Sequence, residues 1–106
     1  MAGAAPDVRR ALDGLLGRTI PTATGKPNRV LGVSSSVVIV GTDRSPQGQP
    51  VEITKIQKAV NDLYRYGELE INVATVGRRS AFVWAVLATL PGTIAETNPR
   101  RIRLQG

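Results

Sequence analysis

Two spacings of apolar residues alternate along the chain, one typical of helices and one typical of strands. Apolar residues fall on one helical face over 7–16, where Asp7 can cap the first turn, and again over 51–66. A third segment, 80–90, is apolar on nearly every side. Because no face of such a helix suits water, we expect it to lie in the core, with Ser80 or a neighbour as its cap.

Shorter segments have the two-residue period of strands. Residues 29–33 and 37–40 are apolar runs separated by three serines, which predicts a β-hairpin. Residues 68–73 alternate strictly between acidic or polar and apolar positions, which predicts a half-buried strand. Residues 93–97 are a further candidate strand.

The connecting segments are rich in glycine and proline. Prolines and a glycine in 19–28 predict a loop without regular structure, and 41–50 is the most loop-like part of the chain. At the C-terminal end, apolar residues alternate with arginines over 99–105. This pattern is compatible with an edge strand or with a flexible linker.

These elements predict a small α+β domain, in which about three helices pack on a small antiparallel sheet that includes the hairpin. A winged-helix-like arrangement is the alternative. We place the domain at 1–97 and a basic tail, or a linker to a missing C-terminal domain, at 98–106. A chain of 106 residues, 42% of them hydrophobic, is long enough for one modest core.

Composition narrows the chemistry. The chain has no cysteine and no histidine, which excludes disulfides, the common zinc sites and catalysis by Ser–His or Cys–His pairs within it. The eight acidic residues form no tight cluster in the sequence. We therefore expect no enzyme activity, no metal and no cofactor. No apolar run is long enough for a membrane span and no signal-peptide pattern is present, so we expect a cytoplasmic protein with no membrane partner.

Charge points to a partner. Fourteen Lys and Arg against eight acids give a net charge of +6, and eleven of the fourteen are Arg. The excess is +3 over 1–51, zero over 52–97 and +3 over 98–106. Arginine suits two-pronged contacts with phosphate and guanine, so a partner that offers these groups is one interpretation, and a basic surface kept for solubility is the other.

One loop carries the side chains that base edges need. An arginine can contact guanine, a glutamine can contact adenine, and an aspartate can accept from a cytosine amino group. A polar surface turn would use the same glycines and prolines, so that simpler interpretation stays open. The candidate base-reading residues are Thr42, Asp43, Arg44, Ser45, Gln47 and Gln49.

Two further segments could hold DNA phosphates. One precedes the predicted hairpin and lacks the spacing of a P-loop, so it could equally be an ordinary connection. The other lies where the buried helix begins, and a helix N-terminus favours an anion. An arginine there could instead pair with Glu68 or Glu70. The candidate phosphate-binding residues are Lys26, Asn28, Arg29, Arg78, Arg79 and Ser80, with the tail arginines as additional contacts.

Three segments taken together resemble a known family. They are Gly-Lys-Pro-Asn-Arg at 25–29, Thr-Asp-Arg-Ser-Pro-Gln-Gly-Gln-Pro-Val at 42–51, and Arg-Ser-Ala-Phe at 79–82 followed by Ala-Val-Leu-Ala-Thr-Leu-Pro-Gly at 85–92. In this order and spacing they resemble the N-terminal head domain of McrA-like, modification-dependent (type IV) HNH restriction endonucleases. Asp43 and Trp84 depart from the residues more usual in that family.

The resemblance implies a module that recognises modified duplex DNA, of the 5-methylcytosine type, for a C-terminal HNH nuclease. Such a nuclease needs histidines and a metal, so this chain would be the recognition part only. The alternative is a non-specific DNA clamp or a dimerisation domain of the same kind of enzyme, and a homodimer on a palindromic site is compatible with the first function.

Overall fold

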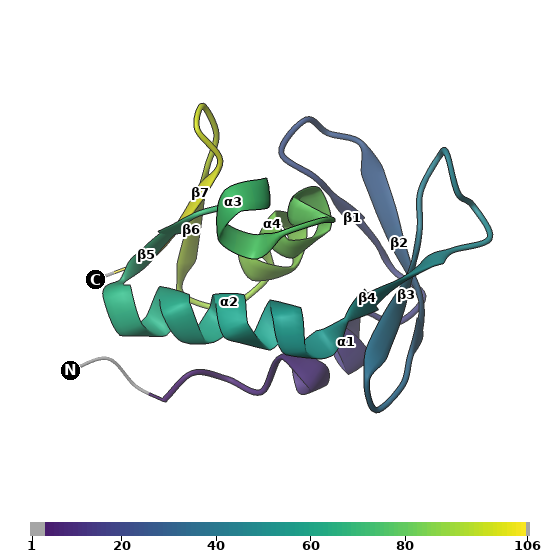
Figure 1. Ribbon diagram of the computed structural model, residues 1–106, viewed down its shortest axis with the longest axis horizontal. Coiled ribbons are helices and arrows are strands. Elements are labelled where there is room, and N and C mark those ends of the chain that lie inside the picture. The colour runs from purple at the N-terminus through teal and green to yellow at the C-terminus, as the bar shows by residue number, and fades with distance from the viewer. Residues whose placement is uncertain (1–3, 106) are drawn as a thin grey trace.

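The computed structural model describes residues 4–105 and has an α+β fold, as the sequence predicts (Figure 1). Two antiparallel sheets, rather than the single sheet expected, flank a group of helices. Within the described residues there are four helices, one more than expected. The separation into two sheets also distinguishes the fold from the winged-helix-like alternative.

The first sheet is a four-stranded meander. Its order is β1-β2-β3-β4, and each strand pairs with its neighbour in sequence. Valines on one face, among them Val30 opposite Val40 and Val38 opposite Val51, are all buried. Because strand side chains alternate between faces, Leu31 and Ile39 lie on the other face, which the β3–β4 loop covers in part. The strands are β1 (Thr19–Pro21), β2 (Pro27–Val33), β3 (Val37–Gly41) and β4 (Gln49–Glu52).

The second sheet has three strands in the order β5-β7-β6. The last strand in sequence, β7, therefore lies in the centre and pairs on both sides. Its Ile102 is completely buried. The strands are β5 (Glu68–Glu70), β6 (Thr93–Glu96) and β7 (Arg101–Leu104).

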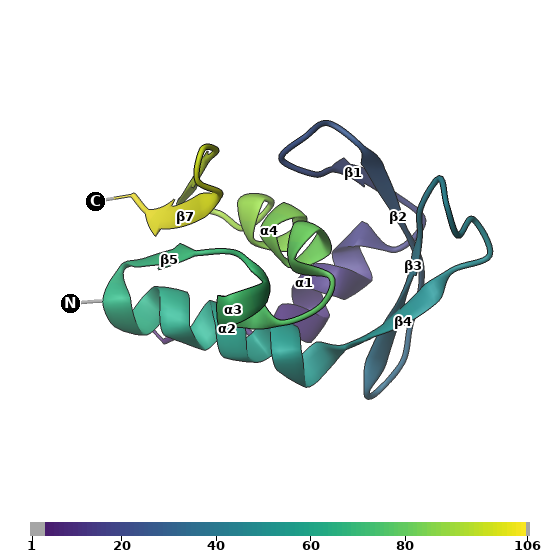
Figure 2. The same ribbon diagram turned by 45° about the horizontal axis from the view of Figure 1, so that its top comes forward.

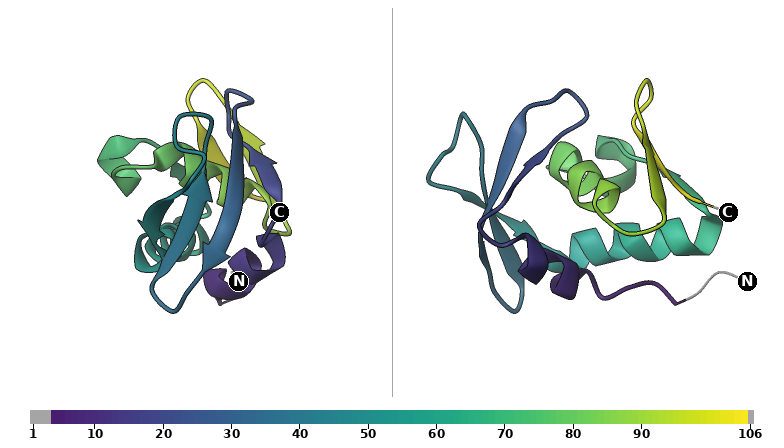
Figure 3. Two further views of the ribbon diagram at one scale, coloured as in Figure 1. Left: turned by 90° about the vertical axis from the view of Figure 1, so that its right-hand side faces the viewer. Right: turned by 180° about the vertical axis from the view of Figure 1, so that it is seen from behind.

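Helix α4 (Ser80–Ala88) lies between the two sheets, and α2 (Ile53–Tyr66) runs along the length of the molecule beside it (Figures 2 and 3). This enclosure explains why the sequence of α4 is apolar all round: residues 82–87 are all buried. Full burial of each large apolar side chain stabilises the fold by roughly 1.5–3 kcal/mol. The indole Nε1 of Trp84 donates to the carbonyl oxygen of Glu96 at 3.2 Å, which joins α4 to β6.

The other two helices are short. Helix α1 (Val8–Leu15) begins as predicted, with the Asp7 carboxylate accepting from the backbone N–H of Arg9 at 3.0 Å. Helix α3 (Val73–Val76) is a single turn that Asn72 and Thr75 close with a reciprocal capping box. We predicted the last part of 68–73 as strand, which is wrong: the capping box ends the alternation after β5.

Two loop boundaries also differ from the predictions. Residues 19–28 were expected to lack regular structure, but 19–21 and the start of β2 form a hairpin. The two prolines fit because Pro21 and Pro27 face each other at the last pair of an edge strand, where a missing N–H costs little. The predicted helix 51–66 begins two residues later, because 49–52 pairs with β3.

The C-terminal segment is neither an edge strand nor a linker over 101–104. It is the central strand of the second sheet, so it belongs to the same domain and the proposed boundary at 97 does not separate it. The alternation of Arg and apolar residues arises because the two faces of β7 meet different surroundings. Ile102 faces the core, whereas Arg101 and Arg103 face acidic residues of the neighbouring strands.

Candidate functional site

Three connections lie on the same side of the molecule. The β1–β2 turn, the β3–β4 loop and the β6–β7 turn all project in the same direction in Figure 1. The first two of these, together with the first turn of α4, enclose an open cleft of about 600 Å³. Its walls therefore come from three parts of the chain that are far apart in sequence.

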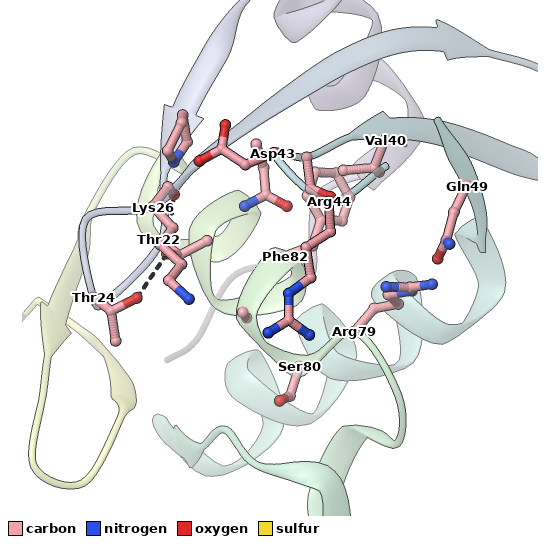
Figure 4. A pocket seen from close by; sticks show the side chains of 14 residues that line it. Thr22, Thr24, Lys26, Val40, Asp43, Arg44, Gln49, Arg79, Ser80 and Phe82 are labelled. Carbon is pink, nitrogen blue, oxygen red and sulfur yellow. Dashed lines mark hydrogen bonds between the residues drawn. The ribbon is translucent and has the colours of Figure 1, made fainter. Parts of the chain in front are cut away.

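The cleft collects most of the predicted site residues. Eight of the twelve line it, drawn from all three predicted segments (Figure 4): Lys26, Asn28, Thr42, Asp43, Arg44, Gln49, Arg79 and Ser80. The other four do not line it. Arg29 lies on the opposite face of β2 from Asn28, as the two-residue period of a strand requires. Ser45, Gln47 and Arg78 lie outside the lining residues.

The β3–β4 loop is held by its own polar groups. The backbone N–H of Ser45 donates to Thr42 Oγ1 at 3.0 Å, and the N–H of Thr42 donates to the carbonyl of Ser45 at 3.1 Å. Gln49 Nε2 donates to Ser45 Oγ at 3.0 Å, while Gln49 Oε1 is buried without a partner among the described residues. Three of the expected base-reading side chains thus also shape the loop.

Gly48 allows this loop to pack directly against the first sheet. Its φ is +97°, and a Cβ at this position would meet Ile39 Cγ2 at 2.5 Å and Leu31 Cδ1 at 2.9 Å. Only glycine combines that backbone conformation with so close an approach. The loop therefore presents Asp43 and Arg44 from a fixed backbone, and both side chains are exposed.

The β1–β2 turn forms the facing wall. Both the backbone N–H and Oγ1 of Thr22 donate to the carbonyl of Lys26 at 3.0 Å, and the turn continues through Gly25 with φ +84°. Lys26 is exposed at the end of this turn, whereas Asn28 is only 7% exposed. No hydrogen bond joins the Asn28 side-chain amide to any group of residues 4–105. It is a buried polar side chain whose amide is left to the cleft.

The first turn of α4 forms the floor. Arg79 precedes the helix in the left-handed conformation, with φ 66° and ψ 29°, and no side chain caps the helix. Val83 is the first residue whose N–H finds a backbone acceptor, the carbonyl of Arg79 at 3.1 Å. The N–H groups of residues 80–82 have no acceptor in the part of the chain that the structure describes. Ser80 is not the cap; its Oγ accepts from Arg100 Nη2 at 3.1 Å.

The charges around the cleft are unbalanced. Lys26, Arg44 and Arg79 contribute three positive charges and Asp43 one negative charge, which leaves +2. The four ion pairs of residues 4–105 involve none of these side chains. In Figure 4 the guanidinium group of Arg44 reaches across the cleft toward the start of α4, and Arg79 extends below Gln49. The cleft is an electropositive hollow open to an anion.

The expectation that an arginine at the start of α4 pairs with Glu68 or Glu70 is wrong. The partner of both acids is Arg101, with N–O distances of 4.0 Å and 3.9 Å. Arg103 pairs with Glu96 at 3.3 Å. The tail arginines 101 and 103, expected as phosphate contacts, pair with acids of the second sheet, whereas Arg78 and Arg79 form no ion pair within residues 4–105.

Sequence reasoning missed three polar residues near the cleft. Thr22 and Thr24 line it, although the sequence predicts an irregular loop over their segment. The pairing of Pro21 with Pro27, which places them, has no sequence signal because prolines argue against a strand. Arg100 was assigned to a tail, and only the position of β7 brings it to Ser80.

Neither a metal centre nor a membrane-spanning element is evident in the described part of the chain. Over residues 4–105, no three acidic, cysteine or histidine side chains come together as a possible metal-binding group. No helix in the same range is both long enough and apolar enough to cross a membrane. Comparisons with protein-family models, with curated proteins and with solved structures gave no match.

Proposed function

We propose that this chain is a DNA-binding module that recognises modified duplex DNA, of the 5-methylcytosine type, for an HNH restriction endonuclease. The observation that carries the proposal is the convergence of the three segments that resemble the McrA-like head domain. They lie apart in sequence and line one cleft. That cleft has a net charge of +2 and free polar groups, a combination suited to DNA.

Discrimination of a modified cytosine requires apolar contact in the major groove. A methyl group on cytosine C5 projects there, as the thymine methyl does. Pro27 and Ala81 are apolar residues at the cleft that retain accessible surface. Contact with one methyl group is worth about 0.8 kcal/mol, roughly a fourfold preference. A dimer on a palindromic site would double this free energy.

The test is fluorescence anisotropy with matched duplexes at two salt concentrations. The duplexes differ only in carrying cytosine, 5-methylcytosine, 5-hydroxymethylcytosine or a phosphorothioate linkage. We expect a several-fold preference for 5-methylcytosine that survives at the higher salt. The matched pair of variants is Arg44→Ala, at the cleft, and Arg10→Ala, exposed on α1 away from it. Only the first should lower affinity.

A second candidate is a non-specific DNA clamp. It is favoured by the loop geometry, since Thr42, Ser45 and Gln49 hydrogen-bond within the loop and base contacts would compete with those bonds. A clamp would bind all four duplexes equally, and its affinity would fall steeply with salt. A dimerisation domain would show a dimer mass by light scattering and no affinity for DNA. Either result would replace the first proposal.

A further inference from the structure

We propose that the cleft seats one phosphodiester group of the DNA backbone at the first turn of α4, with Arg44 and Arg79 as its cationic ligands and Asn28 as a neutral donor. This inference rests on the proposed function for the source of the phosphate. It also changes the role of Arg44, which the sequence alone assigned to a guanine edge.

The backbone at the start of α4 already has the form of an anion site. The three N–H groups of residues 80–82 have no acceptor within residues 4–105, and all three residues line the cleft. The left-handed Arg79 followed by helical Ser80 turns successive N–H groups toward the same side, which creates a concave nest for an oxygen. The positive end of the dipole of this nine-residue helix adds to the attraction.

Asn28 points independently to a ligand. Its side chain is more than nine-tenths buried, lines the cleft, and has no hydrogen-bond partner among residues 4–105. The amide atoms of Asn28 remain open to the cleft, because the one buried side-chain polar atom without a partner among residues 4–105 is Gln49 Oε1. A ligand in the cleft can therefore reach the Asn28 amide. The amide NH2 is a donor that carries no charge, and an oxyanion is the partner that such a donor shares with the free N–H groups of α4.

The cationic side chains favour a phosphate over a base edge. Arg44 reaches from the β3–β4 loop toward the start of α4, so its guanidinium and the helix N-terminus face the same space (Figure 4). A guanine edge offers two neutral acceptors to one arginine. A guanine edge carries no negative charge to balance the net charge of +2, and it leaves the three N–H groups of residues 80–82 without an acceptor. A phosphodiester carries the charge and has oxygens that arginine binds with two prongs.

The first experiment tests the proposed phosphate-binding site without DNA. Dimethyl phosphate, a small diester, is titrated against ¹⁵N-labelled protein and followed by NMR. We expect saturable shifts of the backbone amides of residues 80–82 and of the Asn28 side-chain NH2. The shifts should vanish in the Arg44→Ala, Arg79→Ala double variant and persist in Arg10→Ala. Shifts that do not saturate, or that appear elsewhere, overturn the proposal. Binding of inorganic phosphate but not of the diester overturns a DNA backbone as the source.

The second experiment locates the phosphate in DNA. Each backbone phosphate of the preferred duplex is replaced in turn by a neutral methylphosphonate. One position should lose roughly tenfold in affinity, the size expected for one charged hydrogen-bonded contact. In Arg44→Ala the same replacement should cost clearly less, because one of the groups that hold this phosphate is already missing. Small and equal losses of affinity at every position would overturn the proposed phosphate-binding site.

A buried variant gives a further check. Asn28→Asp keeps the size of the side chain and adds a negative charge facing the phosphate, so it should weaken both dimethyl phosphate and DNA. If this variant fails to fold, the exposed Arg44 and Arg79 still decide the matter. If the protein binds DNA but no single phosphate replacement weakens binding, the proposed phosphate-binding site is wrong and the proposed function stands. Saturable diester binding with no affinity for DNA would remove the proposed function, and with it the assignment of the phosphate to DNA.

Discussion

Two groups of positively charged side chains on this molecule lie in opposite surroundings. At the cleft, Lys26, Arg44 and Arg79 face one carboxylate and form no ion pair within residues 4–105. In the second sheet, Arg101 and Arg103 lie between acidic residues of the strands on either side. The first group is available to bind a ligand, whereas the second already forms ion pairs with acidic residues of the same sheet.

The difference shows why charge counted along the sequence misplaces the basic surface. The C-terminal segment 98–106 has three arginines and no acid, so it looks like the most basic part of the chain. Its charge is offset by Glu68, Glu70 and Glu96, which belong to the neutral middle of the sequence. Ion pairs between strands bring together charges from segments that a count along the sequence treats separately. The net charge of +6 is therefore concentrated elsewhere, including at the cleft.

Charge reversal gives the largest expected contrast between the two groups. Arg44→Glu removes a cationic contact and introduces repulsion, so DNA affinity should fall about 100-fold, or roughly 2.7 kcal/mol. Arg101→Glu adds a fourth carboxylate beside Glu68, Glu70 and Glu96 in the second sheet. It should lower the free energy of unfolding by about 1 kcal/mol with little change in affinity. Anisotropy measures the first quantity and urea denaturation the second. Equal losses of affinity in the two variants would erase the distinction.

The fixed backbone of the β3–β4 loop can be tested next. Gly48→Ala should lower the free energy of unfolding by about 1–3 kcal/mol, because the new Cβ would clash with Ile39 and Leu31 in addition to straining φ. Gly92→Ala is the matched control: its φ is +76°, but nothing lies within 4 Å of the added carbon. It should cost only the backbone strain. If both variants lose the same stability, the loop is not held by the close contact.

The accuracy of the sequence predictions follows the range of the interactions that decide each element. Helices and the 29–40 hairpin depend on local spacing, and their core segments are confirmed. The two prolines of 19–28 and the arginines of 99–105 were misinterpreted, since their structure depends on strands that pair from elsewhere in the chain. The number of sheets was missed for the same reason.

The candidate site follows the same rule. Polar loops and the start of the buried helix could be selected from residue types, and eight of the twelve chosen residues share the cleft. Arg29 belongs to the polar segment predicted to bind phosphate, but strand alternation puts it on the other face from Asn28. Sequence could not show that Asn28 is buried without a partner, because that depends on how the three walls meet.

Arg100 connects the two groups and should give an intermediate effect. It belongs to the β6–β7 turn but donates to Ser80 Oγ at the cleft floor, 3.1 Å away. Arg100→Met keeps much of the side-chain length and removes the donor, so the first turn of α4 loses one restraint. We expect about a threefold loss of DNA affinity, the value of one ordinary hydrogen bond. Arg100→Lys, which can still donate, should recover part of it. A loss as large as that of Arg44→Ala would make Arg100 a direct ligand.

The smallest effect is expected for an ion pair that serves the sheet alone. Arg103 and Glu96 lie 3.3 Å apart, with side chains 43% and 39% exposed. Solvent screens such a pair, so a double-mutant cycle of Arg103→Ala and Glu96→Gln should give a coupling of about 0.2–1 kcal/mol in unfolding. DNA affinity should stay within about twofold of the parent, because a charge already offset by Glu96 offers little to a phosphate. A drop of roughly tenfold in Arg103→Ala would mean that DNA competes with Glu96 for this arginine, and the second sheet would then belong to the binding surface.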